Sequence, residues 1–143
     1  MSEDNKAVAR GVFEAWERGD LDALDGLVAG DAVDHDAYNP FREEGLEGLK
    51  KLVQMYVGAF PDTSFAIEQQ VAEGDLVATR WTATGTHQGE LMGNPASGRS
   101  VKITGTAIDR IQDGKVVESW GNWDTLGMFQ QLGMAGQPEP ARA

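Results

Sequence analysis

The spacing of apolar residues changes once along this chain, at Pro61. Before Pro61 apolar residues recur every three or four positions, the period of an amphipathic helix, and after it they alternate with polar residues, the period of a strand. Proline ends a helix because it lacks the backbone N–H donor. A chain with helices first and strands afterwards is typical of the α+β class, in which a sheet packs against the helices.

Turn and cap residues divide the chain into individual elements. Helices are predicted at 4–18, 21–30 and 46–60, with a short strand or extended segment and a loop at 31–40. Antiparallel strands are predicted at 63–73, 76–87, 101–112 and 115–124, followed by a short helix that Gly133 ends. The Asp113-Gly114 pair is a strong hairpin signal, and the glycine-rich stretch 88–100 is predicted to be a long loop over one end of the sheet. We expect one domain over 1–134 and a flexible tail at 135–143.

Composition limits both the partners and the chemistry of the chain. The formal net charge of −11 opposes binding to nucleic acids or to anionic membranes. No stretch approaches the roughly 18 apolar residues of a membrane span, and the N-terminus lacks the order of a signal peptide, so we expect a cytoplasmic protein. The chain has no Cys and only two His, which excludes thiolate sites. A metal site made from His35, Asp36 and His87 would have no recognisable ligand spacing.

Asp124, at the end of the last predicted strand, is the main candidate for acid/base chemistry. Alternation places it on one face with Trp120 and Asn122, and a carboxylate beside Trp is partly desolvated, which raises its pKa. Asp124 can equally be the N-cap of the following helix, a position that Asp favours. A one-residue bulge would reverse the two faces of the strand, so the sequence leaves both interpretations open.

The other candidates also have a functional and a structural interpretation. His35, within Asp34-His35-Asp36, has an ordinary pKa of ~6.5 and suits acid/base chemistry, although such a run is also typical of a solvated turn. Arg80 and Arg110 can bind a substrate oxygen or pair with surface carboxylates. The remaining predicted ligand-binding residues are mainly core-facing aromatic side chains that can also line a pocket: Trp16, Tyr56, Phe60, His87, Trp120 and Asn122.

Four segments together resemble the SnoaL-like polyketide cyclase family of the nuclear-transport-factor-2-like superfamily. They are 16–24, 33–36, 80–98 and 110–133, in matching order and spacing. The resemblance implies a cystatin-like cone, in which helices pack on a curved antiparallel sheet around a mostly apolar pocket. It also implies an aromatic or polyketide-like ligand, and a homodimer or homotetramer.

The resemblance carries an expected mechanism as well. In the polyketide cyclases of this family an Asp near the end of the last strand is the general acid/base, and it maps onto Asp124. It removes a proton from an activated carbon of an aromatic polyketide ester, and an intramolecular aldol reaction closes a ring without metal or cofactor. Those cyclases also use a His on the preceding strand, where this chain has Asp109 and Arg110, so Arg110 or His35 would take the partner role.

Two other functions remain open for the same fold. One is a hydrolase or hydroxylase in which Asp124 acts together with Arg80, Arg110 or Asp109, as in limonene epoxide hydrolases. The other is a small-molecule-binding module without catalysis, because a fold does not fix a function.

Overall fold

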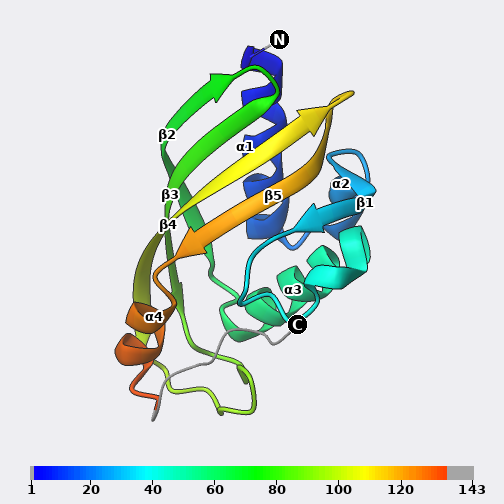
Figure 1. The fold of residues 1–143 in the computed structure, drawn as a ribbon. Helices are drawn as coiled ribbons and strands as arrows, with labels where there is room; N and C mark the ends of the chain where they lie inside the picture. Colours follow the sequence, from blue (N-terminus) through cyan, green and yellow to red (C-terminus); the bar gives the residue numbers. More distant parts are fainter. Residues whose placement is uncertain (1, 135–143) are drawn as a thin grey trace.

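The computed structural model describes residues 2–134, which form one five-stranded sheet with helices packed on it (Figure 1). The strands are β1 (Val28–Asp34), β2 (Ser64–Glu73), β3 (Leu76–Thr86), β4 (Ser100–Gln112) and β5 (Lys115–Trp123). The helices are α1 (Ser2–Arg18), α2 (Leu21–Leu24), α3 (Gly45–Ala59) and α4 (Thr125–Leu132), with a 3-10 turn η1 (Arg42–Glu44). The predicted α+β class is confirmed. The predicted flexible tail at 135–143 lies outside the described residues.

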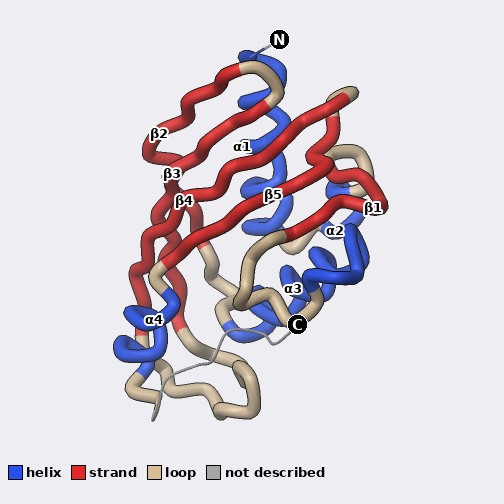
Figure 2. The backbone as a smooth tube through the Cα atoms, in the orientation of Figure 1, coloured by secondary structure: helices blue, strands red, loops and turns tan. Residues whose placement is uncertain are grey.

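The sheet has the order β1-β5-β4-β3-β2. The strands β2 to β5 form the predicted antiparallel meander, whereas β1 pairs with β5 in parallel. Figure 2 shows the long strands curving together, with α1 and α3 on the same side of the sheet and α4 at its lower end. None of the helices within residues 2–134 is both long and apolar enough to cross a membrane.

The predicted helix at 21–30 is wrong beyond Leu24. Only Leu21–Leu24 is helical, and the chain enters β1 at Val28. A short apolar run such as Leu27-Val28 fits a helix and a buried strand equally well, and periodicity cannot separate the two. The backbone N–H of Val116 on β5 donates to the Leu27 carbonyl at 2.8 Å. Pairing with β5 therefore makes this run a strand rather than a helix.

Two apolar clusters hold the helices on the sheet. One joins α1, α2 and α3 to the hairpin ends of β3, β4 and β5, and includes Leu24, Val53 and Val77. The second joins the end of α3 to α4 and the loop after β3, and includes Phe60 and Leu91. Residues of both clusters line the cavity described below, which therefore lies inside the fold between them.

A bulge near the start of β5 decides which side chains face the helices. Arg110 on β4 pairs with Glu118, but the next residue, Ile111, pairs with Val116, so Val117 is the extra residue. An extra residue shifts the alternation of side chains by one position. Beyond Val117 the inward side therefore carries Ser119, Gly121 and Trp123, whereas Glu118 and Trp120 point to the outer face.

Candidate functional site

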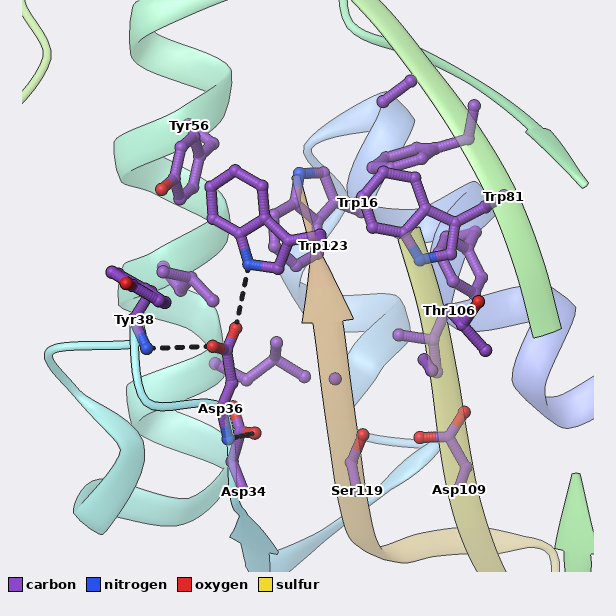
Figure 3. Close-up of a pocket in the computed structure, with 18 of the residues that line it drawn as sticks. Trp16, Asp34, Asp36, Tyr38, Tyr56, Trp81, Thr106, Asp109, Ser119 and Trp123 are labelled. Carbon is purple, nitrogen blue, oxygen red and sulfur yellow. Dashed lines mark hydrogen bonds between the residues drawn. The ribbon is translucent and has the colours of Figure 1, made fainter. Parts of the chain in front are cut away.

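A cavity of about 220 Å³ lies between α1, α3 and the inner face of the sheet. Its walls are mostly apolar and aromatic, and they come from both helices, from β1 and from the four longer strands. This volume is below the ~300–1,000 Å³ of typical drug-sized pockets, so only part of a large ligand would be enclosed. Figure 3 shows Asp34, Asp36, Ser119 and Asp109 in the lower part of the view, with the Tyr56 hydroxyl and the Trp123 indole above them.

Aromatic rings form a continuous wall across the top of the cavity. Trp16 of α1 lies 6.3 Å from Tyr56 of α3, and Tyr56 meets Trp123 of β5 edge to face at 6.1 Å. On the other side Trp16 and Trp81 each contact Phe65 edge to face, at 5.9 and 5.7 Å. Such walls suit a flat, apolar ligand, because edge-to-face and stacked contacts contribute about 0.5–1.5 kcal/mol per ring beyond burial.

Three carboxylates line this apolar space: Asp34, Asp36 and Asp109. Among the described residues that line the cavity there is no Lys, Arg or His. The carboxylates therefore have no cationic partner within the cavity wall.

Asp109 is placed in the cavity by the unbroken alternation of β4. It follows Val101, Ile103 and Ala107 along the inward face, and it lies opposite Ser119 on β5. The side chain is buried, with 8% of its surface exposed. The pKa of Asp109 is raised to about 6. Burial is the main cause, a hydrogen bond with Ser119 opposes the rise, and the nearby charge of Asp34 adds to it. A pKa of about 6 suits a group that takes up and returns a proton near neutral pH.

Asp36 is held by a turn after β1. Its Oδ1 accepts from the Tyr38 backbone N–H at 2.9 Å, a local bond that Asp makes readily, and its Oδ2 accepts from the Trp123 indole Nε1 at 3.3 Å. Burial raises the pKa of the Asp36 carboxyl, and the charge of Asp34 adds to the rise. The Tyr38 and Trp123 hydrogen bonds oppose it, as does the charge of Arg42, which lies outside the cavity lining. Asp34 supports the turn, because it accepts from the Asp36 N–H and from the Asn39 side chain.

Tyr56 brings a hydroxyl to the same side of the cavity (Figure 3). This hydroxyl is buried and has no hydrogen-bond partner among residues 2–134. Burial and the charge of Asp36 raise the pKa of Tyr56, so its hydroxyl stays protonated and can only donate its proton or accept a hydrogen bond. A buried polar atom without a partner costs about 1–3 kcal/mol, which a suitable ligand atom would offset.

Asp124 lies outside this cavity, at the start of α4. Its side chain accepts from the Gly127 backbone N–H at 2.8 Å, and it is exposed. The N-cap interpretation of Asp124 is therefore confirmed. Because of the bulge at Val117, the indole near a cavity carboxylate belongs to Trp123 rather than to Trp120.

His35, Arg110 and Trp120 come together on the outer face of the sheet. The His35 ring stacks on the Trp120 ring with centroids 5.1 Å apart. The Arg110 guanidinium also lies over the Trp120 ring, with its Cζ 5.9 Å from the ring centroid. Glu118 accepts from His35 Nε2 at 2.7 Å and lies 3.5 Å from Arg110, which also pairs with Asp75. None of these five residues lines the cavity.

The remaining predicted ligand-binding residues divide into two groups. Four of them are among the residues that line the cavity: Trp16, Tyr56, Phe60 and Asn122, of which Asn122 is itself exposed. Arg80 instead donates to Gln69 on the neighbouring strand, and His87 is buried beneath the loop after β3, where its Nδ1 accepts from the Ser97 backbone N–H. Within residues 2–134 no three Asp, Glu or His side chains are grouped as metal ligands, so His35, Asp36 and His87 do not form a metal site.

A sequence model of the SnoaL-like polyketide cyclases matches residues 6–132. The chain belongs to the SnoaL-like polyketide cyclase family. The fold agrees with this assignment, because the architecture predicted from the family resemblance, helices on a curved sheet with a short C-terminal helix, is present. No curated protein sequence matches the chain significantly.

Similar solved structures come from Streptomyces. TsrD from Streptomyces laurentii has a TM-score of 0.84 and 28% identity, covering 93% of this chain and 97% of that one. IdmH, a proposed polyketide cyclase from Streptomyces antibioticus, has a TM-score of 0.78 and 37% identity, covering 91% and 99%. AclR, a proposed hydroxylase from Streptomyces galilaeus, has a TM-score of 0.80 and 33% identity, covering 93% and 98%.

In this SnoaL-like protein, the sequence predicts Asp109 only as a member of a possible Asp–Arg site and not as a buried cavity residue. The alternation of β4 does contain a signal, because Asp109 ends a run in which every second residue is small or apolar. A carboxylate at the end of such a face is either exposed at the rim or buried in the core. Asp109 is only 8% exposed, so it is buried. Asp36 gives no comparable signal, since its position depends on the turn after β1.

Proposed function

We propose that this protein is a cofactor-independent polyketide cyclase that closes a ring by an intramolecular aldol reaction, with Asp109 as the acid/base residue. The observation that carries the proposal is a buried carboxylate with a pKa of about 6 in the wall of an aromatic cavity. Family membership and the similarity to IdmH, itself a proposed polyketide cyclase, support it.

The proposed reaction moves one proton and forms one carbon–carbon bond. Ionised Asp109 removes a proton from a ligand carbon flanked by carbonyl groups, which leaves an enolate. The enolate carbon attacks a second carbonyl carbon of the same ligand, and the oxygen that becomes an alkoxide takes the proton back from Asp109. Substrate and product are isomers, so the step needs no oxidant or reductant. The cavity holds the two carbons in contact, and such orientation can supply roughly 7–11 kcal/mol of the barrier.

The charge of the cavity supports a neutral substrate such as an ester. A ligand carboxylate would lie near Asp34, Asp36 and Asp109 without any cationic side chain in the lining. Bringing like charges together in a poorly solvated space is unfavourable. We therefore infer that the part of the ligand inside the cavity carries a neutral ester or ketone group rather than a carboxylate.

A hydrolase or hydroxylase with an Asp–Arg site is less consistent with the geometry. It requires a guanidinium beside a cavity carboxylate, whereas Arg80 and Arg110 are both held on the outer face. The third possibility, a binding module without catalysis, gives no role to the raised pKa of Asp109.

The proposal is tested with a synthetic diketone that can close one ring. We would use naphthalene carrying a β-keto ester side chain and, on the adjacent ring carbon, a 2-oxopropyl group. Wild-type protein is expected to accelerate closure, with a rate that rises with pH through about 6 as Asp109 ionises. Asp109→Asn is expected to slow closure at least ~100-fold, the usual contribution of a general base.

The matched control for this assay is Asp31→Asn, which removes an exposed carboxylate from the same protein. It is expected to close the ring at the wild-type rate. If a folded Asp109→Asn protein closed the ring as fast as this control, Asp109 would not be the acid/base residue.

A further inference from the structure

The end of the cavity around Asp36 has hydrogen-bonding capacity that the described residues do not use. An ionised carboxylate can accept about four hydrogen bonds, and Asp36 accepts two, from Tyr38 and Trp123. The Trp123 contact, at 3.3 Å, is slightly longer than the usual ~2.7–3.2 Å of an N–H···O hydrogen bond. The proposed aldol reaction uses Asp109 as its acid/base residue and assigns no role to Asp36.

The space next to this carboxylate is open because residue 121 is glycine. Gly121 follows the bulge of β5 and faces inward, and a Cβ built on it would meet only the Asp36 Oδ2, at 4.0 Å. A side chain at this position would occupy the gap between the strand and the carboxylate. Its absence leaves room for a ligand atom at hydrogen-bonding distance from Asp36.

Tyr56 supplies a complementary group on the same side. Its buried hydroxyl has no partner within the described part of the chain, and it is close enough to Asp36 for the carboxylate charge to raise its pKa. Trp123 contacts both residues, because its ring meets Tyr56 edge to face at 6.1 Å and its indole N–H donates to Asp36 at 3.3 Å. Asp36 and Tyr56 therefore present one acceptor and one donor on the same side of the cavity. A ligand edge that satisfies both must carry a donor next to an acceptor.

We propose that Asp36, Tyr56 and Gly121 form a subsite for a hydroxyl–carbonyl edge of the ligand. A phenolic or enolic hydroxyl donates to Asp36, and the neighbouring carbonyl oxygen accepts from the Tyr56 hydroxyl. The subsite adds detail to the proposed function. It rests on that proposal in one respect, that the cavity is where the ligand binds. It narrows the substrate class to neutral aromatic esters or ketones that carry a hydroxyl beside the carbonyl.

Equilibrium binding of small aromatic esters tests the subsite without turnover. The probes are methyl 3-hydroxy-2-naphthoate and its methyl ether, methyl 3-methoxy-2-naphthoate, titrated calorimetrically into the full-length protein. Wild-type protein is expected to bind the hydroxy ester about 10- to 100-fold more tightly, the usual worth of a hydrogen bond to a charged group. Asp36→Asn keeps the Oδ1 acceptor for Tyr38, and it is expected to reduce this preference to about threefold or less.

Three further variants separate the contributions. Tyr56→Phe is expected to weaken both esters about 3- to 10-fold and to leave their ratio unchanged, since both keep the carbonyl. Gly121→Ala is expected to weaken the hydroxy ester while leaving the carboxylate in place. Asp31→Asn is the control and is expected to bind both probes as wild type does.

Several outcomes would overturn the subsite. One is a folded Asp36→Asn protein that retains the preference for the hydroxy ester, and another is wild-type protein that binds neither ester. A third is tighter binding of 2-naphthylmethylamine that Asp36→Asn abolishes, because the site would then take a cation. Asp36-dependent binding in a protein without ring-closing activity would keep the subsite and remove the proposed catalysis, so the two failures are distinguishable.

Discussion

Asp109 makes the folded protein less stable at neutral pH than it would be with a neutral side chain. Its pKa is 3.8 in the unfolded chain and about 6 in the folded protein, a difference on the order of 3 kcal/mol. The unfolded chain releases this proton at lower pH than the folded protein does. The free energy of unfolding therefore falls as the pH rises from about 4 to about 6, and the loss is complete above that range.

Asp109→Asn should for this reason be more stable than wild type above pH 6. The variant is neutral at every pH, so it avoids the cost of a buried charge, and the two proteins should converge toward pH 4. Urea unfolding at pH 4, 5, 6 and 7 measures the difference. Equal stability of the two proteins at pH 7 would contradict the raised pKa.

Asp124 is expected to affect stability through its cap. Asp124→Ala removes the acceptor for the Gly127 N–H and should lower the free energy of unfolding by about 0.5–2 kcal/mol. Asp124→Ser restores a capping acceptor and should recover most of the loss. Thermal unfolding of the three proteins measures this series.

The same Asp124 variants decide between the cap and the acid/base role implied by the family resemblance. A cap alone predicts that folded Asp124→Ser closes the ring of the diketone probe as wild type does. Loss of ring closure in a variant of normal stability would show that Asp124 acts in the chemistry although it lies outside the cavity.

At the scale of the element, the bulge at Val117 sets the composition of the cavity wall. Without it, strict alternation would carry Glu118 and Trp120 inward and would turn Ser119 and Trp123 outward. That arrangement would bury Glu118, which pairs with His35 and Arg110 on the outer face.

Deletion of Val117 is therefore expected to be severely destabilising. The chain must either bury Glu118 without its partners or break the pairing of β4 with β5, and a loss above ~4 kcal/mol is expected. Val117→Ala keeps the residue count and should cost little by comparison. Circular dichroism and chemical unfolding distinguish the two, and near-wild-type stability of the deletion would contradict the role of the bulge.

At the scale of the whole molecule, the net charge of −11 opposes compactness. The repulsion among surface carboxylates is long-ranged, and about 0.15 M salt reduces the screening length to ~8 Å. The exposed ion pairs that salt also weakens, such as Lys50 with Asp25 at 2.7 Å, contribute only about 0–1 kcal/mol each. Screening of the net charge should therefore be the larger effect.

We accordingly expect the melting temperature to rise when sodium chloride is increased from 10 to 150 mM. An increase in stability of about 1 kcal/mol would correspond to ~2–4 °C for a chain of this size. The comparison requires a constant buffer at pH 7, and sucrose of equal osmolality controls for solvent effects. A falling melting temperature would mean that the surface ion pairs outweigh the net repulsion.

The sequence by itself determined most of the elements of this fold. The change of period at Pro61, the Asp113-Gly114 turn and the alternation of the long strands predicted α1, α3, the four antiparallel strands and α4 within a few residues. Local rules suffice there because each signal concerns a turn or a face of a single element. They failed at Val28, where the hydrogen bonds of β5 convert a helix-compatible run into β1.

Only the tertiary structure decided which carboxylates share the cavity. Asp36 and Asp109 are 73 residues apart in the chain, and they line one space because β1 lies beside β5 and β5 beside β4. The one-residue shift at Val117 then brings Trp123 and Gly121 to Asp36 and leaves Trp120 with His35. A bulge depends on the pairing of two strands, so the sequence of either strand alone does not specify it.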